Sequence, residues 1–219
     1  MKVLVISPHA DDETLGAGGT LLKYKEQGAE INWLNITDLK EEYGYSRERV
    51  LERTIEIKNT AKAYQVEHFF NLRLKPAGVD EYGISFLVSE ISKVICEVQP
   101  DTIFIPYKYD VHSDHKVVFE ATFSCTKVFR HPYVKKILCM EILSETDYAE
   151  ADSGFIPNYF VDISDYLEQK ITIMKNYGSE MGSPPFPRSA ENIRSLARYR
   201  GAAAGVMYAE GFRLLKMIE

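Results

Sequence analysis

Residues 8–20 place several ionisable side chains directly after an apolar segment. The sequence there reads Pro-His-Ala-Asp-Asp-Glu-Thr-Leu-Gly-Ala-Gly-Gly-Thr, and it follows the apolar run Val3–Ile6. Each ionised acid at such a position must stay hydrated, be paired or bind a cation. Histidine nitrogen and carboxylate oxygen together form a ligand set that suits zinc. His9 and Asp12 are therefore the first two candidate metal ligands.

A second cluster, His112-Ser-Asp-His115, has the same setting as the first. It follows a strand expected at residues 102–107 and precedes an expected helix. The carboxyl ends of parallel strands meet at one edge of an α/β sheet, and ligands bind in the crevice at that edge. Three of the five histidines thus fall in two strand-to-helix turns. We expect the two clusters to form one site.

The spacing within the clusters narrows the set of ligands. Residues three apart at the start of a helix share a face, so His9 and Asp12 can contact one ion. The same holds for His112 and His115. Catalytic zinc has three protein ligands and keeps one position for water. We predict His115 as the third ligand, because this choice leaves His112 free as an acid or as a donor to an oxyanion.

The first cluster also has two interpretations that need no metal. Histidine and acids at a helix start can serve as caps, and Glu13 also favours the helix dipole there. The glycines could belong to a dinucleotide-binding turn, but no full G-x-G-x-x-G follows the strand. Close packing of the helix on the sheet is the better account of Gly16, Gly18 and Gly19.

Apolar runs alternate with amphipathic segments along the chain, which is the pattern of parallel βαβ units. The pattern predicts strands at residues 2–7, 30–37, 67–72, 102–107, 136–142 and 158–163. It predicts helices at residues 15–27, 46–64, 84–98, 114–129, 164–174 and 190–204. We expect a Rossmann-like α/β fold, with helices on both faces of a mostly parallel sheet in a three-layer sandwich. Residues 1–143 carry the motifs and the tail 144–219 packs on them, so that residues 1–219 form one domain.

Composition and charge exclude several classes of protein. The net charge of −6 and the absence of a basic block argue against a nucleic-acid partner. No apolar stretch approaches the ~20 residues of a membrane span, and the first apolar run is too short for a signal peptide. Cys96, Cys125 and Cys139 share no metal-ligand spacing and indicate reduced thiols. We expect a cytoplasmic protein with a small-molecule partner.

The two clusters resemble the signatures of the PIG-L/LmbE family of zinc-dependent N-deacetylases, P-H-x-D-D-E-x-x-G-x-G-G and H-x-D-H. They stand here at residues 8–19 and 112–115. The segment from Arg53 to Val66 is similar to the family's R-x-x-E…A-x-x-L-G-V helix, except that Tyr64-Gln65 replaces Leu-Gly. The resemblance covers essentially the whole chain.

The resemblance implies a Rossmann-like fold, a catalytic zinc ion and removal of the acetyl group from an N-acetylglucosamine unit. It matches three residues to the zinc ligands: His9, Asp12 and His115. It also matches Asp11 to the general base, His112 to an electrostatic partner and Arg53 to a substrate contact. An ion pair with Glu56 or Glu52 accounts for Arg53 equally well. The resemblance further implies self-association as a trimer or hexamer.

The expected reaction is zinc-assisted hydrolysis of an amide, in which zinc acidifies a water molecule and polarises the carbonyl. Asp11 would take the proton of that water, and His112 would hold the oxyanion as an imidazolium. Either Asp11 or His112 would then protonate the departing amine. Two other functions stay open: an amidase acting on another small acylated amine or thiol–sugar conjugate, and a metal- or sugar-binding module without activity. Asp11, which is not needed as a ligand, argues against the module. The sequence does not identify what the sugar is attached to, whether nucleotide, lipid, glycan or thiol precursor.

Overall fold

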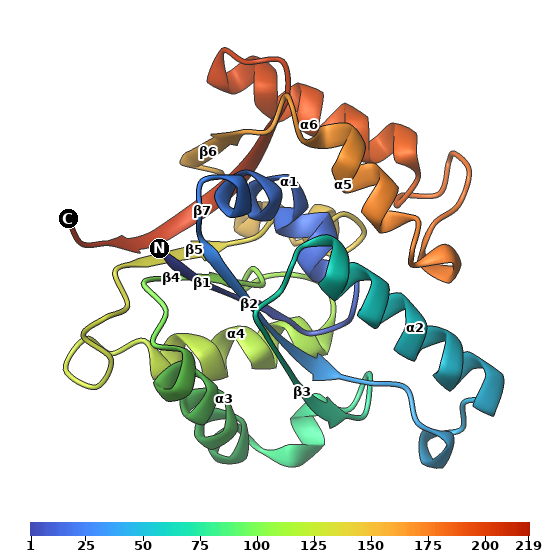
Figure 1. The fold of residues 1–219 in the computed structure, drawn as a ribbon, viewed down its shortest axis with the longest axis vertical. Coiled ribbons are helices and arrows are strands. Elements are labelled where there is room, and N and C mark those ends of the chain that lie inside the picture. The colour runs from blue at the N-terminus through green and yellow to red at the C-terminus, as the bar shows by residue number, and fades with distance from the viewer.

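The computed structural model describes residues 1–219 and contains one seven-stranded sheet in the order β3-β2-β1-β4-β5-β7-β6 (Figure 1). Strands β1 to β5 run parallel, while β7 is antiparallel to both β5 and β6. The strands are β1 (Lys2–Ser7), β2 (Glu30–Thr37), β3 (His68–Leu74), β4 (Thr102–Ile105), β5 (Lys136–Cys139), β6 (Tyr159–Asp162) and β7 (Ala209–Met217). Strands β6 and β7 of the tail thus extend the same sheet, and one domain over residues 1–219 stays a prediction.

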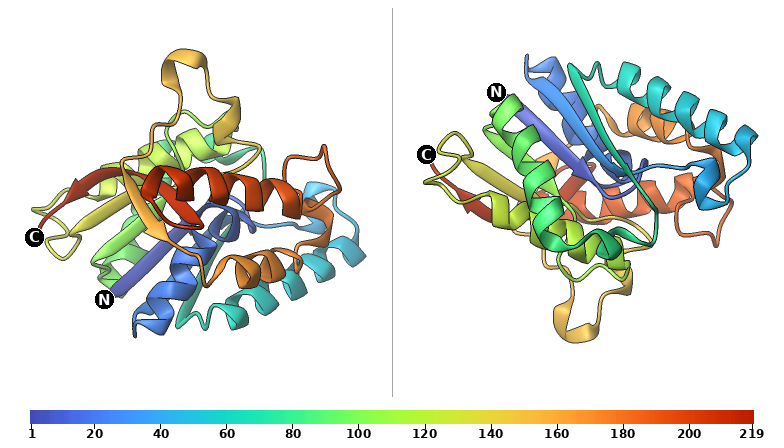
Figure 2. Two further views of the ribbon diagram at one scale, coloured as in Figure 1. Left: turned by 90° about the horizontal axis from the view of Figure 1, so that it is seen from above. Right: turned by 90° about the horizontal axis from the view of Figure 1, so that it is seen from below.

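Six α-helices cover the two faces of the sheet, as Figures 1 and 2 show. They are α1 (Asp12–Glu26), α2 (Arg47–Ala63), α3 (Ile84–Val98), α4 (Ser113–Cys125), α5 (Leu167–Met174) and α6 (Ala190–Ala204). Helices α3 and α4 pack on one face, and the other four helices pack on the opposite face. This three-layer arrangement confirms the predicted α/β fold class. No helix combines the length and the apolar character that crossing a bilayer would require.

Strand β1 lies in the middle of the sheet and contributes to both hydrophobic cores. Val3 and Val5 face the core beneath α1, whereas Leu4 and Ile6 face the core beneath α3 and α4. A strand that is covered on both faces needs a continuous apolar run, which is why these four residues carry no polar group. The polar cluster can begin only after Ser7, where the chain leaves the sheet.

The glycines of the first cluster lie inside α1 and allow this helix to approach its neighbours closely. A Cβ atom added at Gly16 would lie 2.6 Å from Cβ of Met140, and one at Gly19 would lie 2.8 Å from Cβ of Ile163. These distances are shorter than side chains tolerate. Close packing is therefore confirmed as the role of these glycines, and a dinucleotide-binding turn is excluded because they are helical.

We expect Gly19→Ala to lower the free energy of unfolding by about 1–3 kcal/mol, as overpacked core positions do. Alanine alone would favour the helix by up to about 1 kcal/mol, but Ile163 is fully buried and cannot move aside. Urea unfolding followed by circular dichroism measures the change. Gly178→Ala is the matched control, because nothing lies within 4 Å of its new methyl group. A Gly19→Ala protein as stable as the wild type would contradict the packing argument.

Several element boundaries differ from the sequence predictions, each for a local physical reason. Helix α1 begins at Asp12 instead of residue 15, because the Asp11 carbonyl already accepts from the Leu15 amide at 2.9 Å. Strand β4 ends before Pro106, which has no amide hydrogen to donate. Helix α4 ends at Cys125 instead of residue 129, and strand β5 ends at Cys139 instead of residue 142.

The last strand, β7, was not predicted at all. Its sequence, AEGFRLLKM, contains helix-favouring residues and does not alternate between apolar and polar positions. Its extended form comes from hydrogen-bonded pairing with β5 on one side and β6 on the other. Such tertiary pairing outweighs the weak local preference of a strand.

Candidate metal centre and active site

The two polar clusters lie together at the carboxyl ends of β1 and β4, which pair directly in the sheet. Strands β2 and β3 lie on one side of this pair and β5 on the other, so the strand order reverses here. Such a switch point is where open α/β sheets bind ligands. His9 follows β1, Asp12 begins α1, and His115 lies in the first turn of α4.

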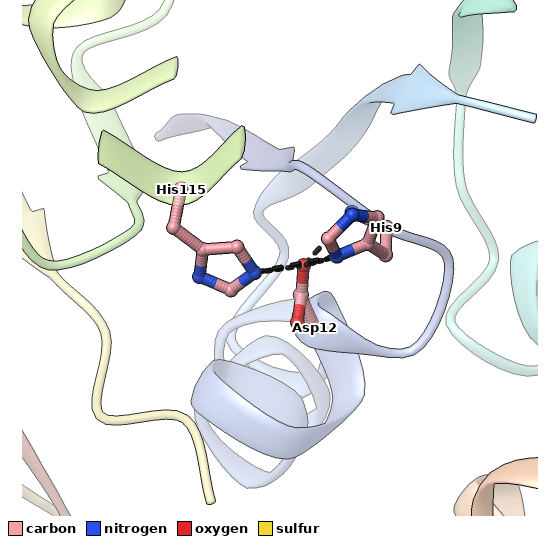
Figure 3. A group of neighbouring side chains, drawn as sticks. All are labelled: His9, Asp12 and His115. Atoms are coloured by element: carbon pink, nitrogen blue, oxygen red, sulfur yellow. Dashed lines mark hydrogen bonds and ion pairs between the residues drawn. The ribbon is translucent and has the colours of Figure 1, made fainter. Parts of the chain in front are cut away.

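Three of these side chains converge on one point, as Figure 3 shows. The Nε2 atom of His115 lies 3.3 Å from Oδ2 of Asp12, and Nδ1 of His9 lies 3.6 Å from the same oxygen. The two histidine nitrogens are 3.3 Å apart. Atoms at these separations can all reach a single ion at about 2.0–2.2 Å, the usual zinc distance for nitrogen and oxygen ligands. The donor set therefore fits a divalent metal such as zinc.

A buried carboxylate orients the ring of His115. Its Nδ1 atom lies 2.8 Å from Oδ2 of Asp110, whose other oxygen accepts from the hydroxyl of Thr146 at 2.7 Å. All three residues are buried. With Nδ1 donating to Asp110, Nε2 is the nitrogen that can give up its proton and coordinate a metal, as in carboxylate–histidine–metal arrangements.

Asp114 plays the same part for His9, whose Nε2 lies 3.0 Å from Oδ2 of Asp114. The carboxylate also accepts from the amides of Ala77 and Val79 at 2.8 and 3.1 Å. His9, His112 and Asp114 are close enough to form a second group of metal-ligand atoms. Nε2 of His9 and the Asp114 carboxylate are already paired with each other, and Nδ1 of His112 accepts from the Asp114 amide at 3.1 Å. We therefore interpret His112 and Asp114 as residues that surround the ligand His9, and not as part of a second metal site.

Asp12 and His115 each shift the pKa of the other. Burial by itself raises the pKa of Asp12, but the adjacent His115 and His9 outweigh it and bring the pKa to about 2. Burial likewise lowers the pKa of His115, yet the carboxylates of Asp12 and Asp110 raise it well above its ordinary value. The carboxylates of Asp12 and Asp110 would stabilise either a proton on His115 or a bound metal cation. Metal binding would therefore release a proton.

Asp11 stands beside this centre without belonging to the ligand set. Its backbone has φ of 146°, which is unusual for any residue but glycine, and its side chain makes no capping hydrogen bond to α1. Instead Oδ2 accepts from Nη1 of Arg188 at 2.8 Å. Burial and the neighbouring Asp12 raise the pKa of Asp11 well above its usual range. Strained backbone and a perturbed carboxyl group mark functional positions, so helix capping does not account for Asp11.

Glu13 fixes the backbone of Asp11 from the protein interior. One carboxylate oxygen accepts from the Asp11 amide at 3.1 Å. The other accepts from the hydroxyls of Thr14 and Tyr177 at 2.7 and 3.0 Å. Burial raises the pKa of Glu13 to about 7. Glu13 therefore ties the turn that presents Asp11 to Thr14 and Tyr177, so an interaction with the helix dipole is not its only role.

His112 faces the centre as a neutral ring. Because Nδ1 accepts from the Asp114 amide, the ring's proton lies on Nε2. Burial and the nearby His9 lower the pKa of His112 to about 4. The imidazolium form expected from the sequence is thus disfavoured, while a neutral Nε2–H donor is available.

Comparison with known proteins places these residues in a family. The model of the family PIG-L, described as GlcNAc-PI de-N-acetylase, matches residues 4–126, which include both clusters. The chain belongs to the PIG-L family. It is 29% identical over 227 residues to diacetylchitobiose deacetylase from Thermococcus kodakarensis, covering 98% of this chain and 83% of that protein.

Two further relatives extend this PIG-L comparison. A probable N-acetyl-α-D-glucosaminyl L-malate deacetylase 2 from Bacillus cereus is 26% identical over 186 residues, which cover 81% of this chain and 83% of that protein. The structure of N,N'-diacetylchitobiose deacetylase from Pyrococcus horikoshii superposes with a TM-score of 0.75 and 25% identity. That match covers 98% of this chain and 84% of the other.

This PIG-L protein departs from the family pattern directly after helix α2. Gln65 stands at the pattern's glycine and adopts φ of 49°, a backbone region that glycine enters most easily. Tyr64, at the pattern's leucine, is buried and donates its hydroxyl to Oγ1 of Thr14 at 3.2 Å. The departure thus alters the support of α1 and leaves the metal-binding atoms unchanged.

A cavity of about 480 Å³ opens in front of the centre, within the size range of small-molecule sites. His9, Asp11, Asp12 and His112 line it. Arg53 lines it too, although it is only 7% exposed.

Arg53 forms the ion pair considered from the sequence and also borders the cavity. It donates to the Ala10 carbonyl behind the first cluster and to Glu180. Its Nε atom lies 3.0 Å from Oε2 of Glu56, so the ion pair is with Glu56 and not with Glu52.

The aromatic and proline-rich tail, which includes Arg188, is expected from the sequence to help shape the cavity. Sequence reasoning missed the contact of Arg188 with Asp11 and the cavity residues Glu180, Ser144 and Glu145. Arg188 and Glu180 come from the irregular segment between α5 and α6, and Arg188 contacts Asp11 across 177 positions of the chain. Ser144 and Glu145, which follow β5, also line the cavity. No local pattern distinguishes Glu180, Ser144 and Glu145 from ordinary loop residues.

Proposed function

We propose that this protein is a zinc-dependent hydrolase that removes the N-acetyl group from an N-acetylglucosamine-type amino sugar or its conjugate. The observation that carries the proposal is Asp11. It is a buried, strained carboxylate that borders the cavity beside a complete three-donor metal site and is not one of the donors. A protein that only binds metal or sugar has no need of such a group.

When bound by His9, Asp12 and His115, zinc would acidify a water molecule and polarise the acetamide carbonyl. Asp11 accepts the proton of the attacking water at its carboxylate. Its raised pKa suits it to return this proton to the departing amine. His112 donates from Nε2 to the carbonyl oxygen as negative charge develops there.

The relatives support an amino-sugar substrate, because those named above are deacetylases of diacetylchitobiose or of N-acetylglucosaminyl malate. Arg53, at the cavity wall, is proposed to contact the substrate. The free thiols of Cys96, Cys125 and Cys139 are in keeping with the proposed cytoplasmic location, where disulfides are rare. Self-association as a trimer or hexamer stays a prediction, which light scattering coupled to size-exclusion chromatography would measure.

The deciding experiment is to measure acetate release from acetylated amino sugars by the zinc-loaded protein, with and without a chelator. We expect release that stops with 1,10-phenanthroline and returns when zinc is added back. Release that is insensitive to the chelator would exclude a role for zinc. Release only from acylated amines that are not sugars would favour the amidase. Zinc binding without release from any amide would favour the binding module.

A further inference from the structure

The cavity has no positive charge to spare for an anionic substrate. Three guanidinium groups line it, and Glu180 lies within 4 Å of all of them. Arg188 also pairs with Asp11 at 2.8 Å. The other two arginines, Arg49 and Arg53, each also lie 3.0 Å from an oxygen of Glu56. An incoming phosphate or carboxylate would have to displace one of these partners.

The balance of charge over the whole cavity leads to the same conclusion. Five acidic side chains line it against the three arginines, which leaves an excess of two negative charges. The acidic residues are Asp11, Asp12, Asp38, Glu145 and Glu180. A single divalent cation at the proposed metal centre compensates this excess. The substrate therefore meets a cavity that is already neutral.

Four buried polar atoms of the cavity wall have no hydrogen-bond partner within the protein, and two of them are oxygens. The other two are the Nε atoms of Arg53 and Arg188, whose charges are already paired with acidic side chains. The carboxylate of Glu145 makes no hydrogen bond or ion pair, and its Oε2 atom is shielded from solvent. The hydroxyl of the adjacent Ser144 is also buried without a partner. Ser144 has φ of 72°, an unfavourable conformation for a residue with a side chain. Unpaired buried acceptors and local strain together indicate a position that a ligand completes.

We propose that the substrate is an uncharged glycan and that Glu145 and Ser144 bind its hydroxyl groups. This inference rests on the proposed deacetylase function and narrows its substrate class. A sugar hydroxyl can donate to the Glu145 carboxylate, which satisfies the unpaired acceptor. A phosphate or carboxylate has no hydrogen to donate at neutral pH, and it would be desolvated beside a like charge. Burial already raises the pKa of Glu145, and a second anion would meet the same unfavourable surroundings.

The test compares a neutral substrate, N,N'-diacetylchitobiose, with two anionic ones, N-acetylglucosamine 1-phosphate and N-acetylglucosaminyl malate. We expect wild-type kcat/KM to be at least about 10-fold higher for the neutral substrate. In Glu145→Gln, kcat/KM for diacetylchitobiose should fall by about 10- to 100-fold, mainly through KM, as loss of a hydrogen bond to a charged group predicts. The values for the anionic substrates should hold or rise, because a repulsive charge is removed.

Asp147→Asn is the matched control, since it removes the same charge from an exposed position two residues further along and outside the cavity lining. It should leave all three substrates unchanged. Both variants should keep the wild-type melting temperature, because the Glu145 side chain makes no hydrogen bond or ion pair that the substitution would break. Calorimetric titration of the zinc-loaded Asp11→Asn variant, which should bind its substrate but turn it over only slowly, gives a second readout in which diacetylchitobiose binds and the sugar phosphate does not.

Equal or better turnover of the anionic substrates, or a Glu145→Gln protein that behaves like Asp147→Asn, would overturn this inference and leave the deacetylase function standing. Acetate release from none of the three would overturn the deacetylase function instead. Calorimetry alone would then test the inference about the substrate. Equal binding of the neutral and the anionic sugar would contradict it.

Discussion

Asp11→Asn is expected to lower kcat/KM for deacetylation by about 10²- to 10⁴-fold, the range that a general base contributes, while zinc stays bound. Asparagine retains the shape of the side chain and can still accept from Arg188, but it cannot take a proton from water. The three metal-binding atoms belong to other residues, so zinc content should remain at the wild-type level. Acetate release and metal analysis on the same preparation measure the two effects together.

Asp38→Asn is a suitable control for this prediction. Asp38 lines the same cavity, but its carboxylate is held by Asn71 and Arg73 at 2.9 and 3.2 Å, away from the reacting groups. Its replacement should change kcat/KM by no more than about 10-fold. Turnover that survives in Asp11→Asn would remove Asp11 as the base. A parallel loss of zinc would show that its role is structural.

His115→Ala and His112→Ala are both expected to lower turnover, but only His115→Ala should lose the metal. His115→Ala removes one of three protein ligands and also leaves Asp110 and Asp12 without their shared partner, so bound zinc should be lost together with activity. His112→Ala leaves the three ligand atoms in place and removes only the Nε2–H donor. It should retain zinc and lose about 10²- to 10³-fold in kcat, as loss of one oxyanion donor does.

Metal content after dialysis, measured by mass spectrometry on both variants, distinguishes the two histidines. Circular dichroism must first show that His115→Ala is folded, because the substitution leaves two buried carboxylates facing each other. His115→Asn offers a smaller change if the alanine variant is not folded. Greater zinc loss in His112→Ala than in the His115 variants would reverse the assignment of the third ligand.

The sequence by itself was enough to predict the fold class and to select the side chains that converge at the candidate metal centre, because both depend on short-range patterns. The apolar runs place β1 and β4 in the sheet, and the polar residues that follow each run must emerge at the same edge. Spacings of three residues then bring His9 towards Asp12 within one turn of chain. Both the shared sheet edge and the three-residue spacing follow from backbone geometry. They can therefore be predicted without knowing the other contacts of the fold.

Only the tertiary structure shows which groups surround Asp11 and line the cavity. Arg188 reaches Asp11 from a segment near the end of the chain, and Glu145 enters the cavity because β5 ends early and turns towards it. The protonation of His112 likewise depends on one amide hydrogen bond and on the burial of its ring. Contacts between distant segments, and the burial that shifts a pKa, follow from the packing of the whole chain. No local pattern of residue types records them.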